Sequence, residues 1–147
     1  MAEEVYVNGE GMILGRLASK LAKLLLSGKR VYVVNAEKVV VSGDRSALIY
    51  YYKRTILGVR SHLSHRWRPK RPRSPTRLLK AAVWGMLPKN NKGIRAMKSL
   101  RVYVGVPEEL KGKDFVSFEE ASSGRLARRP VPLAVIAREL GWRGGEA

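Results

Sequence analysis

One long segment of this chain carries many cationic side chains and no anionic ones. Between Arg45 and Pro107 there is no Asp or Glu, yet these residues include 16 of the 29 Lys and Arg residues of the 147-residue chain. Nearly all of the formal net charge of +17 therefore belongs to this acid-free window, residues 45–107. A folded protein tolerates such concentrated like charge when a polyanion neutralises it, so nucleic acid is the first expected partner.

Arginine suits this chemistry because its planar guanidinium pairs with phosphate through two hydrogen bonds, while aromatic rings provide surfaces on which bases stack. Residues 59–74 combine Arg, Lys and Pro with few large apolar side chains, which predicts a basic arm that tracks phosphates. The alternative to a phosphate-tracking arm is that residues 59–74 form a merely solvated loop. The predicted RNA-binding residues are Lys53, Arg54, Arg60, His62, His65, Arg66, Trp67, Arg68, Lys70, Arg71, Arg73, Arg77, Lys80, Trp84, Lys89, Lys92 and Arg95.

A glycine motif competes with this interpretation. Gly9, Gly11 and Gly15 lie between a predicted strand and a predicted helix, and Glu37 follows the next strand, as in a dinucleotide-binding fold. However, bulky side chains occupy residues 12–14, where small residues would have to approach a pyrophosphate. We therefore expect a structural turn and no cofactor.

Catalysis is not expected either. His62 and His65 have a spacing that suits a metal ion, but no carboxylate follows them until Glu108, and two His among arginines repel a cation. These two imidazoles are also the only candidate general bases inside the acid-free window, although Glu37 or Asp44 could approach from elsewhere in the fold. We predict no metal site and no enzyme, with a nucleic acid-processing enzyme as the alternative.

A third possibility is a basic adaptor. Pro69, Pro72 and Pro75 recur every third residue and form a PxxP pattern, which signalling domains bind. Such motifs usually lie in disordered linkers, whereas this one runs directly into a helix with a good N-terminal cap. The phosphate-tracking arm explains the charge better.

Composition narrows the class of protein. With 45% hydrophobic residues, 147 residues are enough for one domain with a core, and the absence of Cys excludes disulfides and thiol catalysis. The N-terminus has no basic, then apolar, leader pattern, and no run of 18 apolar residues occurs. The expectation is a soluble, cytoplasmic protein with no membrane partner and no small-molecule substrate.

Hydrophobic periodicity predicts the elements that position these residues. Strands are expected at 5–7, 31–35, 39–41 and 102–106. Helices are expected at 15–26, from the Ser42–Asp44 entry to about Ile56, from Pro75 to Pro88, at 94–99 and from Pro132 to Gly141, and Ser117–Glu120 fits a capping box. The alternation of strands and helices indicates an α/β fold.

Two helices carry more specific predictions. In the helix expected from Ser42–Asp44 to about Ile56, the expected inward face consists of Ala47, Leu48, Tyr51 and Tyr52. In the helix from Pro75, the expected inward stripe is Leu78, Leu79, Ala82, Val83 and Met86. Trp84 lies with Arg77 and Lys80 on the opposite face, where stacking on a nucleotide is favoured over burial. Gly85 in a helix costs roughly 1 kcal/mol relative to Ala, which predicts a close neighbour there.

Several separated motifs then resemble one family, the large-subunit ribosomal protein numbered thirteen in the universal nomenclature. The resemblance runs from about Val5 to Pro107, and its order of motifs makes it specific. The motifs are GRLASKLAK at 15–23, VVNAE at 33–37, Ser42-Gly43, RPRSP at 71–75 and GMLPK at 85–89 with Gly93. The proline-arginine arm and the lack of a long C-terminal helical extension are similar to archaeal members. Trp84 departs from the family, which usually has Arg there.

The resemblance implies a three-layer α/β/α domain with a small, mostly parallel central sheet and a basic extended arm. It implies a structural role in the large ribosomal subunit, in the cytoplasm, with large-subunit rRNA and neighbouring large-subunit ribosomal proteins as partners. We expect one rRNA-binding domain over residues 1–147, with the arm at about 59–74 and a more acidic C-terminal segment at 107–147. Residues 45–101 are expected to face or penetrate rRNA.

Overall fold

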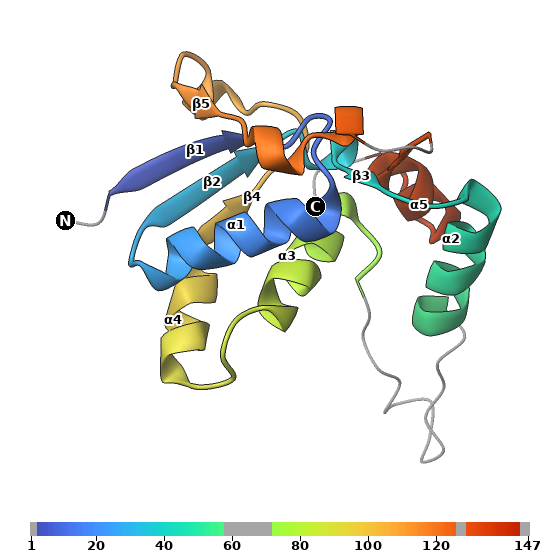
Figure 1. The fold of residues 1–147 in the computed structure, drawn as a ribbon, viewed down its shortest axis with the longest axis horizontal. Helices are drawn as coiled ribbons and strands as arrows, with labels where there is room; N and C mark the ends of the chain where they lie inside the picture. The colour runs from blue at the N-terminus through green and yellow to red at the C-terminus, as the bar shows by residue number, and fades with distance from the viewer. Residues whose placement is uncertain (1–2, 58–71, 126–128, 145–147) are drawn as a thin grey trace.

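A parallel sheet organises the protein. The computed structural model describes residues 3–57, 72–125 and 129–144. Its strands run in the order β4-β2-β1-β5 and every neighbouring pair is parallel. Figure 1 shows the strands β1 (Glu4–Asn8), β2 (Arg30–Val34), β4 (Leu100–Val102) and β5 (Phe115–Val116). The β-branched residues of β1 and β2 suit the interior of such a sheet.

Three helices lie below the sheet in Figure 1. They are α1 (Leu14–Leu26), α3 (Pro75–Gly85) and α4 (Asn91–Lys98), and α1 contacts both of the others. The core forms where Val7, Val31 and Val33 of the sheet meet Leu17 and Leu21 of α1, all five of them fully buried. Each such side chain contributes about 1.5–3 kcal/mol by leaving water.

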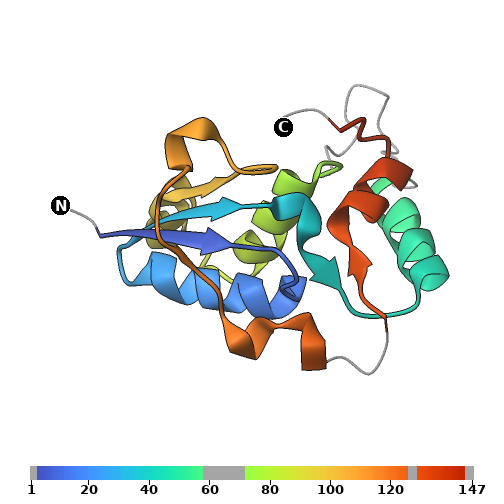
Figure 2. The ribbon, with the colours of Figure 1, turned by 90° about the horizontal axis from the view of Figure 1, so that it is seen from above.

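The opposite face of the sheet points toward the viewer in Figure 2. Aromatic side chains lie on this face. Tyr6 and Tyr32 are register partners on β1 and β2, and their rings stack with centroids 5.2 Å apart. Phe115 of β5 packs edge-on against Tyr6. The two faces thus follow the period of two that a strand imposes.

A smaller unit adjoins the ends of the main strands, at the right of Figure 1. Strands β3 (Val40–Val41) and β6 (Val131–Pro132) pair antiparallel, and α5 (Leu133–Glu139) follows directly. Helix α5 contacts α3 and also α2 (Arg45–Tyr52), which runs on into one π-helical turn, η2 (Lys53–Leu57). The remaining elements are the 3₁₀ turns η1 (Ala36–Lys38), η4 (Glu108–Leu110), η5 (Glu119–Ala121) and η6 (Ser123–Arg125).

This arrangement confirms the predicted α/β class, with a small, mostly parallel central sheet flanked by helices. The helices predicted at 15–26, from Pro75 and from Pro132 are present within one to three residues. Leu133, Ile136, Ala137 and Leu140 are buried as expected. Among the described residues, no helix is long and apolar enough to cross a membrane.

Two predicted elements are wrong. The strand expected at 102–106 is β4, Leu100–Val102, because the chain leaves the sheet after Tyr103 and turns at Gly105, whose φ is +68°. The capping box at Ser117–Glu120 begins no α-helix. It leads instead into the single 3₁₀ turn η5, which has no side-chain cap.

Candidate nucleic-acid interface

Helix α3 presents its basic residues outward because its start and its buried stripe fix its rotation. Ser74 is the predicted N-cap, and its Oγ accepts a hydrogen bond from the backbone N–H of Arg77 at 3.4 Å. Leu78, Leu79 and Val83 are buried in the core. Arg77 is exposed and Lys80 half-exposed on the other side, as expected.

The end of α3 differs from the prediction. Met86 is 45% exposed, and Leu87 takes its place in the core. The helix ends at Gly85, so the chain no longer follows the helical period when it reaches these two residues. Gly85 itself has no neighbour that a Cβ would meet within 4 Å, so the close packing predicted there is absent.

Trp84 is half-buried and packs against the core, which corrects the expected outward orientation. Lys89 Nζ lies 4.0 Å from the centroid of the Trp84 ring and also donates to the Trp84 carbonyl oxygen. The ammonium group is attracted by the electron-rich ring face, an arrangement that holds the loop after α3. One face of the indole is therefore already covered by the protein's own lysine.

Helix α4 follows through a tight approach of two backbone segments. The Asn90 side chain caps it by accepting from Gly93 N at 3.1 Å. A Cβ on Gly93 would lie 1.7 Å from the Pro88 carbonyl oxygen, so only glycine fits. With Gly93 and Ala96 turned inward, Lys92 and Arg95 are exposed.

The end of α2 contributes a third group of cations. Lys53 is exposed but its Nζ forms an ion pair with Glu139 of α5 at 3.2 Å, whereas Arg54 is exposed without such a partner. Burial raises the pKa of the Tyr52 phenol, which packs against the core beside Lys53. Arg73, just before α3, is also exposed.

Among the described residues, few cations of the acid-free window are paired with an acid of the protein. Outside it, Lys20, Lys29 and Lys38 form ion pairs with Glu120, Glu3 and Glu10. Inside it, and within the described ranges 45–57 and 72–107, Lys53 is the only basic residue in an ion pair. Arg54 of η2 and the cations of α3 and α4 are thus left for a partner to neutralise.

The structure describes part of the predicted site and leaves part undescribed. Eight predicted residues lie outside the described ranges: Arg60, His62, His65, Arg66, Trp67, Arg68, Lys70 and Arg71. The other nine lie on or beside α3, α4 and η2.

The sequence interpretation missed two aromatic residues on α2. Tyr50 is 66% exposed and Tyr51 is 59% exposed, although Tyr51 was expected to face inward with Ala47, which is exposed as well. The residues that do pack against the core are Leu48, Tyr52 and Ile56. Their spacing of four residues is also that of Ala47 and Tyr51, so the spacing alone does not tell which face of α2 is buried.

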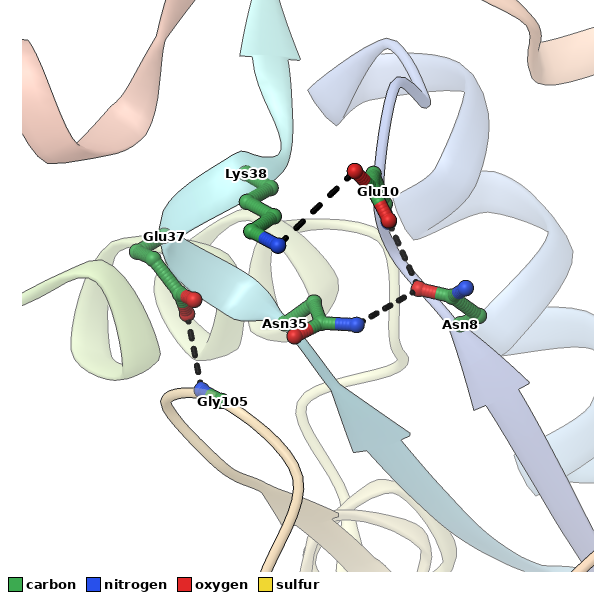
Figure 3. Close-up of polar contacts among 6 residues, drawn as sticks. All are labelled: Asn8, Glu10, Asn35, Glu37, Lys38 and Gly105. Carbon is green, nitrogen blue, oxygen red and sulfur yellow. Dashed lines mark hydrogen bonds and ion pairs between the residues drawn. The ribbon is translucent and has the colours of Figure 1, made fainter.

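The glycine motif and Glu37 form a closed structural junction, drawn in Figure 3. Glu37 accepts a hydrogen bond from Gly105 N at 2.9 Å, and Asn35 Nδ2 donates to Asn8 Oδ1 at 3.0 Å. Lys38 pairs with Glu10 across the same junction at 3.8 Å. The acid that a ribose would need is thus used to hold the turn after β4.

The loop before α1 is filled by the protein itself. Gly9 is buried, and a Cβ there would lie 2.8 Å from Val39 Cγ2. Met12 and Ile13 are buried, and Ile13 N donates to the Ala121 carbonyl oxygen at 2.7 Å. The segment containing η5 therefore covers the N-terminus of α1, where a pyrophosphate would have to bind.

Comparison with known proteins agrees with this geometry. The sequence model of the family described as Ribosomal protein L13 matches residues 2–109. The large ribosomal subunit protein uL13 of Aeropyrum pernix is 61% identical over 145 residues, which cover 98% of this chain and 94% of that protein. The proteins of the same name from Saccharolobus solfataricus and Archaeoglobus fulgidus are each 43% identical over 141 residues, covering 95% and 94% of this chain and 94% and 88% of their own.

The match extends over the motifs that position the basic helices as well as over the junction at Glu37. The family model and these archaeal relatives cover far more than half of the sequence. The chain belongs to the ribosomal protein L13 family.

Proposed function

We propose that this protein is a structural constituent of the large ribosomal subunit, which binds large-subunit rRNA and supports assembly of the subunit. It acts as one rRNA-binding domain and performs no catalysis. Its relatives are named large ribosomal subunit proteins, which supports the assignment. Neighbouring ribosomal proteins are its other partners, and the ribosome in the cytoplasm is its location.

The observation that carries the proposal is the charge of α3, α4 and Arg54, which forms no ion pair among the described residues and lies in a window of sequence without acids. A solvated surface gains little from like charges, whereas phosphates neutralise them and release counterions. Arg77, Lys80, Lys92 and Arg95 are the proposed phosphate contacts among the described residues, joined by Arg54 and Arg73. Trp84 contributes by positioning Lys89.

The basic arm at residues 59–74 completes the proposed interface. Its residues Arg66, Arg68, Lys70 and Arg71 contribute charge for phosphates, and Trp67 contributes a ring for stacking. The more acidic segment at 107–147 lies outside this interface and completes the domain.

Co-sedimentation tests the function directly. We expect the protein from native extracts to sediment with the large subunit and to stay there in high-salt washes that remove loosely bound factors. The purified protein should leave an rRNA fragment intact with or without Mg²⁺. Cleavage of RNA that a chelator stops would instead favour a nucleic acid-processing enzyme, and recovery only in the ribosome-free supernatant would contradict the proposal.

A further inference from the structure

Helix α2 has an outward stripe that the fold does not use. Ala47, Tyr50 and Tyr51 of α2 follow the spacing i, i+3, i+4, Arg54 follows at i+7 in the π-helical turn η2, and all four are exposed. The two tyrosines are the most exposed large apolar side chains of the described residues, at 66% and 59%. We call these four residues the α2 stripe.

The helix is held in place without these side chains. Leu48, Tyr52 and Ile56 pack against the core on the other side of α2. The Asp44 side chain caps the first turn by accepting from Ala47 N at 3.3 Å, and Lys53 pairs with Glu139 of α5. Removing the rings of Tyr50 and Tyr51 should therefore leave the fold intact.

The orientation of Tyr51 is nevertheless fixed. Its ring meets the Tyr52 ring edge-on, with centroids 5.6 Å apart and planes at 85°. Because Tyr52 is anchored in the core, Tyr51 is presented by a rigid support. A ring that is pre-oriented loses little conformational entropy when a planar group stacks on it.

We propose that the α2 stripe binds unpaired nucleotides of RNA, with Tyr50 and Tyr51 stacking on bases and Arg54 pairing with a phosphate. This inference rests on the proposed rRNA-binding function and names which part of the RNA meets this helix. Duplex RNA hides its base faces, whereas loops and bulges expose bases that stack on aromatic side chains. The stripe itself contains no acid and ends on the cation Arg54, while the neighbouring acids Asp44 and Glu139 are engaged in the cap of α2 and the ion pair with Lys53.

A groove on a neighbouring protein fits the stripe less well. Helices that dock in such grooves present apolar anchors at i, i+3, i+4 and i+7. Here those positions are an Ala, two hydroxyl-bearing rings and a cation, so the apolar anchor is weak and Arg54 would need an acidic counterpart. RNA offers bases that stack on the two rings and a phosphate that pairs with Arg54.

Binding to an isolated large-subunit rRNA fragment at several salt concentrations tests the proposal. The double variant Tyr50→Ala/Tyr51→Ala should bind more weakly by roughly 5- to 150-fold for each stacked base. Its slope of log affinity against log salt should equal that of the wild type, because no cation is lost. Tyr50→Phe/Tyr51→Phe should keep most of the affinity, and Arg54→Ala should flatten the slope by about 0.7–0.9.

Controls separate the possible failures. Val116→Ala truncates another exposed apolar side chain, 45% exposed, on β5 outside the acid-free window and should not change affinity. Wild-type affinity in Tyr50→Ala/Tyr51→Ala would overturn the inference while leaving the proposed function standing. If that variant bound RNA normally but failed to enter subunits reconstituted with the other proteins, the stripe would dock on protein and the inference would also be wrong. A wild-type protein that did not bind the fragment would instead refute the proposed function.

Discussion

Gly93 shows at the scale of one residue how the loop between α3 and α4 sets the position of the basic helices. Its Cα faces the Pro88 carbonyl oxygen, leaving no room for a Cβ. We expect Gly93→Ala to lower the free energy of unfolding by about 1–3 kcal/mol or more, because the loop must move to relieve the overlap. Urea denaturation measures the change.

Gly85 provides the matched control for Gly93. It ends α3, has no neighbour within 4 Å of a Cβ and does not have a positive φ. Gly85→Ala should be neutral or stabilise the protein by up to about 1 kcal/mol. Equal losses in the two variants would show that the contact with Pro88 is not what selects glycine at 93.

The sequence led to a close neighbour being predicted for Gly85, which has none, whereas the space around Gly93 was not predicted. Gly85 was given a close neighbour from helix propensity alone, which reports the cost of a glycine but not what surrounds it. The tight contact joins Gly93, in the first turn of α4, to Pro88, five residues earlier in the loop after α3, and no periodicity predicts the path of that loop. The basic residues themselves were easier to identify, because the absence of nearby acids is visible in the sequence.

At the scale of elements, the cap of α3 fixes where Arg77 and Lys80 lie on the helix. Ser74 is nearly buried and accepts from Arg77 N. Ser74→Ala should lower stability by about 1 kcal/mol through loss of this cap. Thermal or urea unfolding measures the loss, and Ser19→Ala, at an exposed site in the middle of α1, should cause none. A tolerated Ser74→Ala would mean that packing alone sets the start of α3.

Predictability differed among the elements for a physical reason. Helix α1 has a clear stripe of Leu and Ala, and its limits were predicted almost to the residue. Helix α2 has aromatic residues at 50, 51 and 52, so adjacent faces are equally apolar and periodicity does not choose between them. The contact between α2 and α5 in the folded protein selects the buried face of α2. Tyr52 packs inward, and the rings of Tyr50 and Tyr51 remain outside. The prediction of a strand at 102–106 was wrong for a similar reason. An apolar run in the sequence does not reveal where the neighbouring strand of the sheet ends.

At the scale of the whole molecule, basic residues are sorted along the chain, because one window without acids holds nearly all of the net charge. Lys20, Lys29 and Lys38, outside this window, pair with acids of the same protein, while the described basic residues of the window, apart from Lys53, do not. This sorting was predictable from the sequence, but the elements that display the charge were not fully predictable. The central claim that follows is that basic residues of α3 and α4 contact phosphates directly.

The most direct test compares two variants that lose the same charge. One replaces Arg77, Lys80, Lys92 and Arg95 with Ala, and the other replaces Arg16, Lys23, Lys111 and Arg138, which are exposed outside the window. Long-range attraction falls equally in both, so only direct phosphate contacts distinguish them.

Affinity for a large-subunit rRNA fragment is then measured against salt concentration. For the α3 and α4 variant, the slope of log affinity against log salt should flatten by roughly 3, at about 0.7–0.9 for each lost contact, and by less than about 1 for the control. Equal slopes in the two variants would contradict direct phosphate binding by α3 and α4.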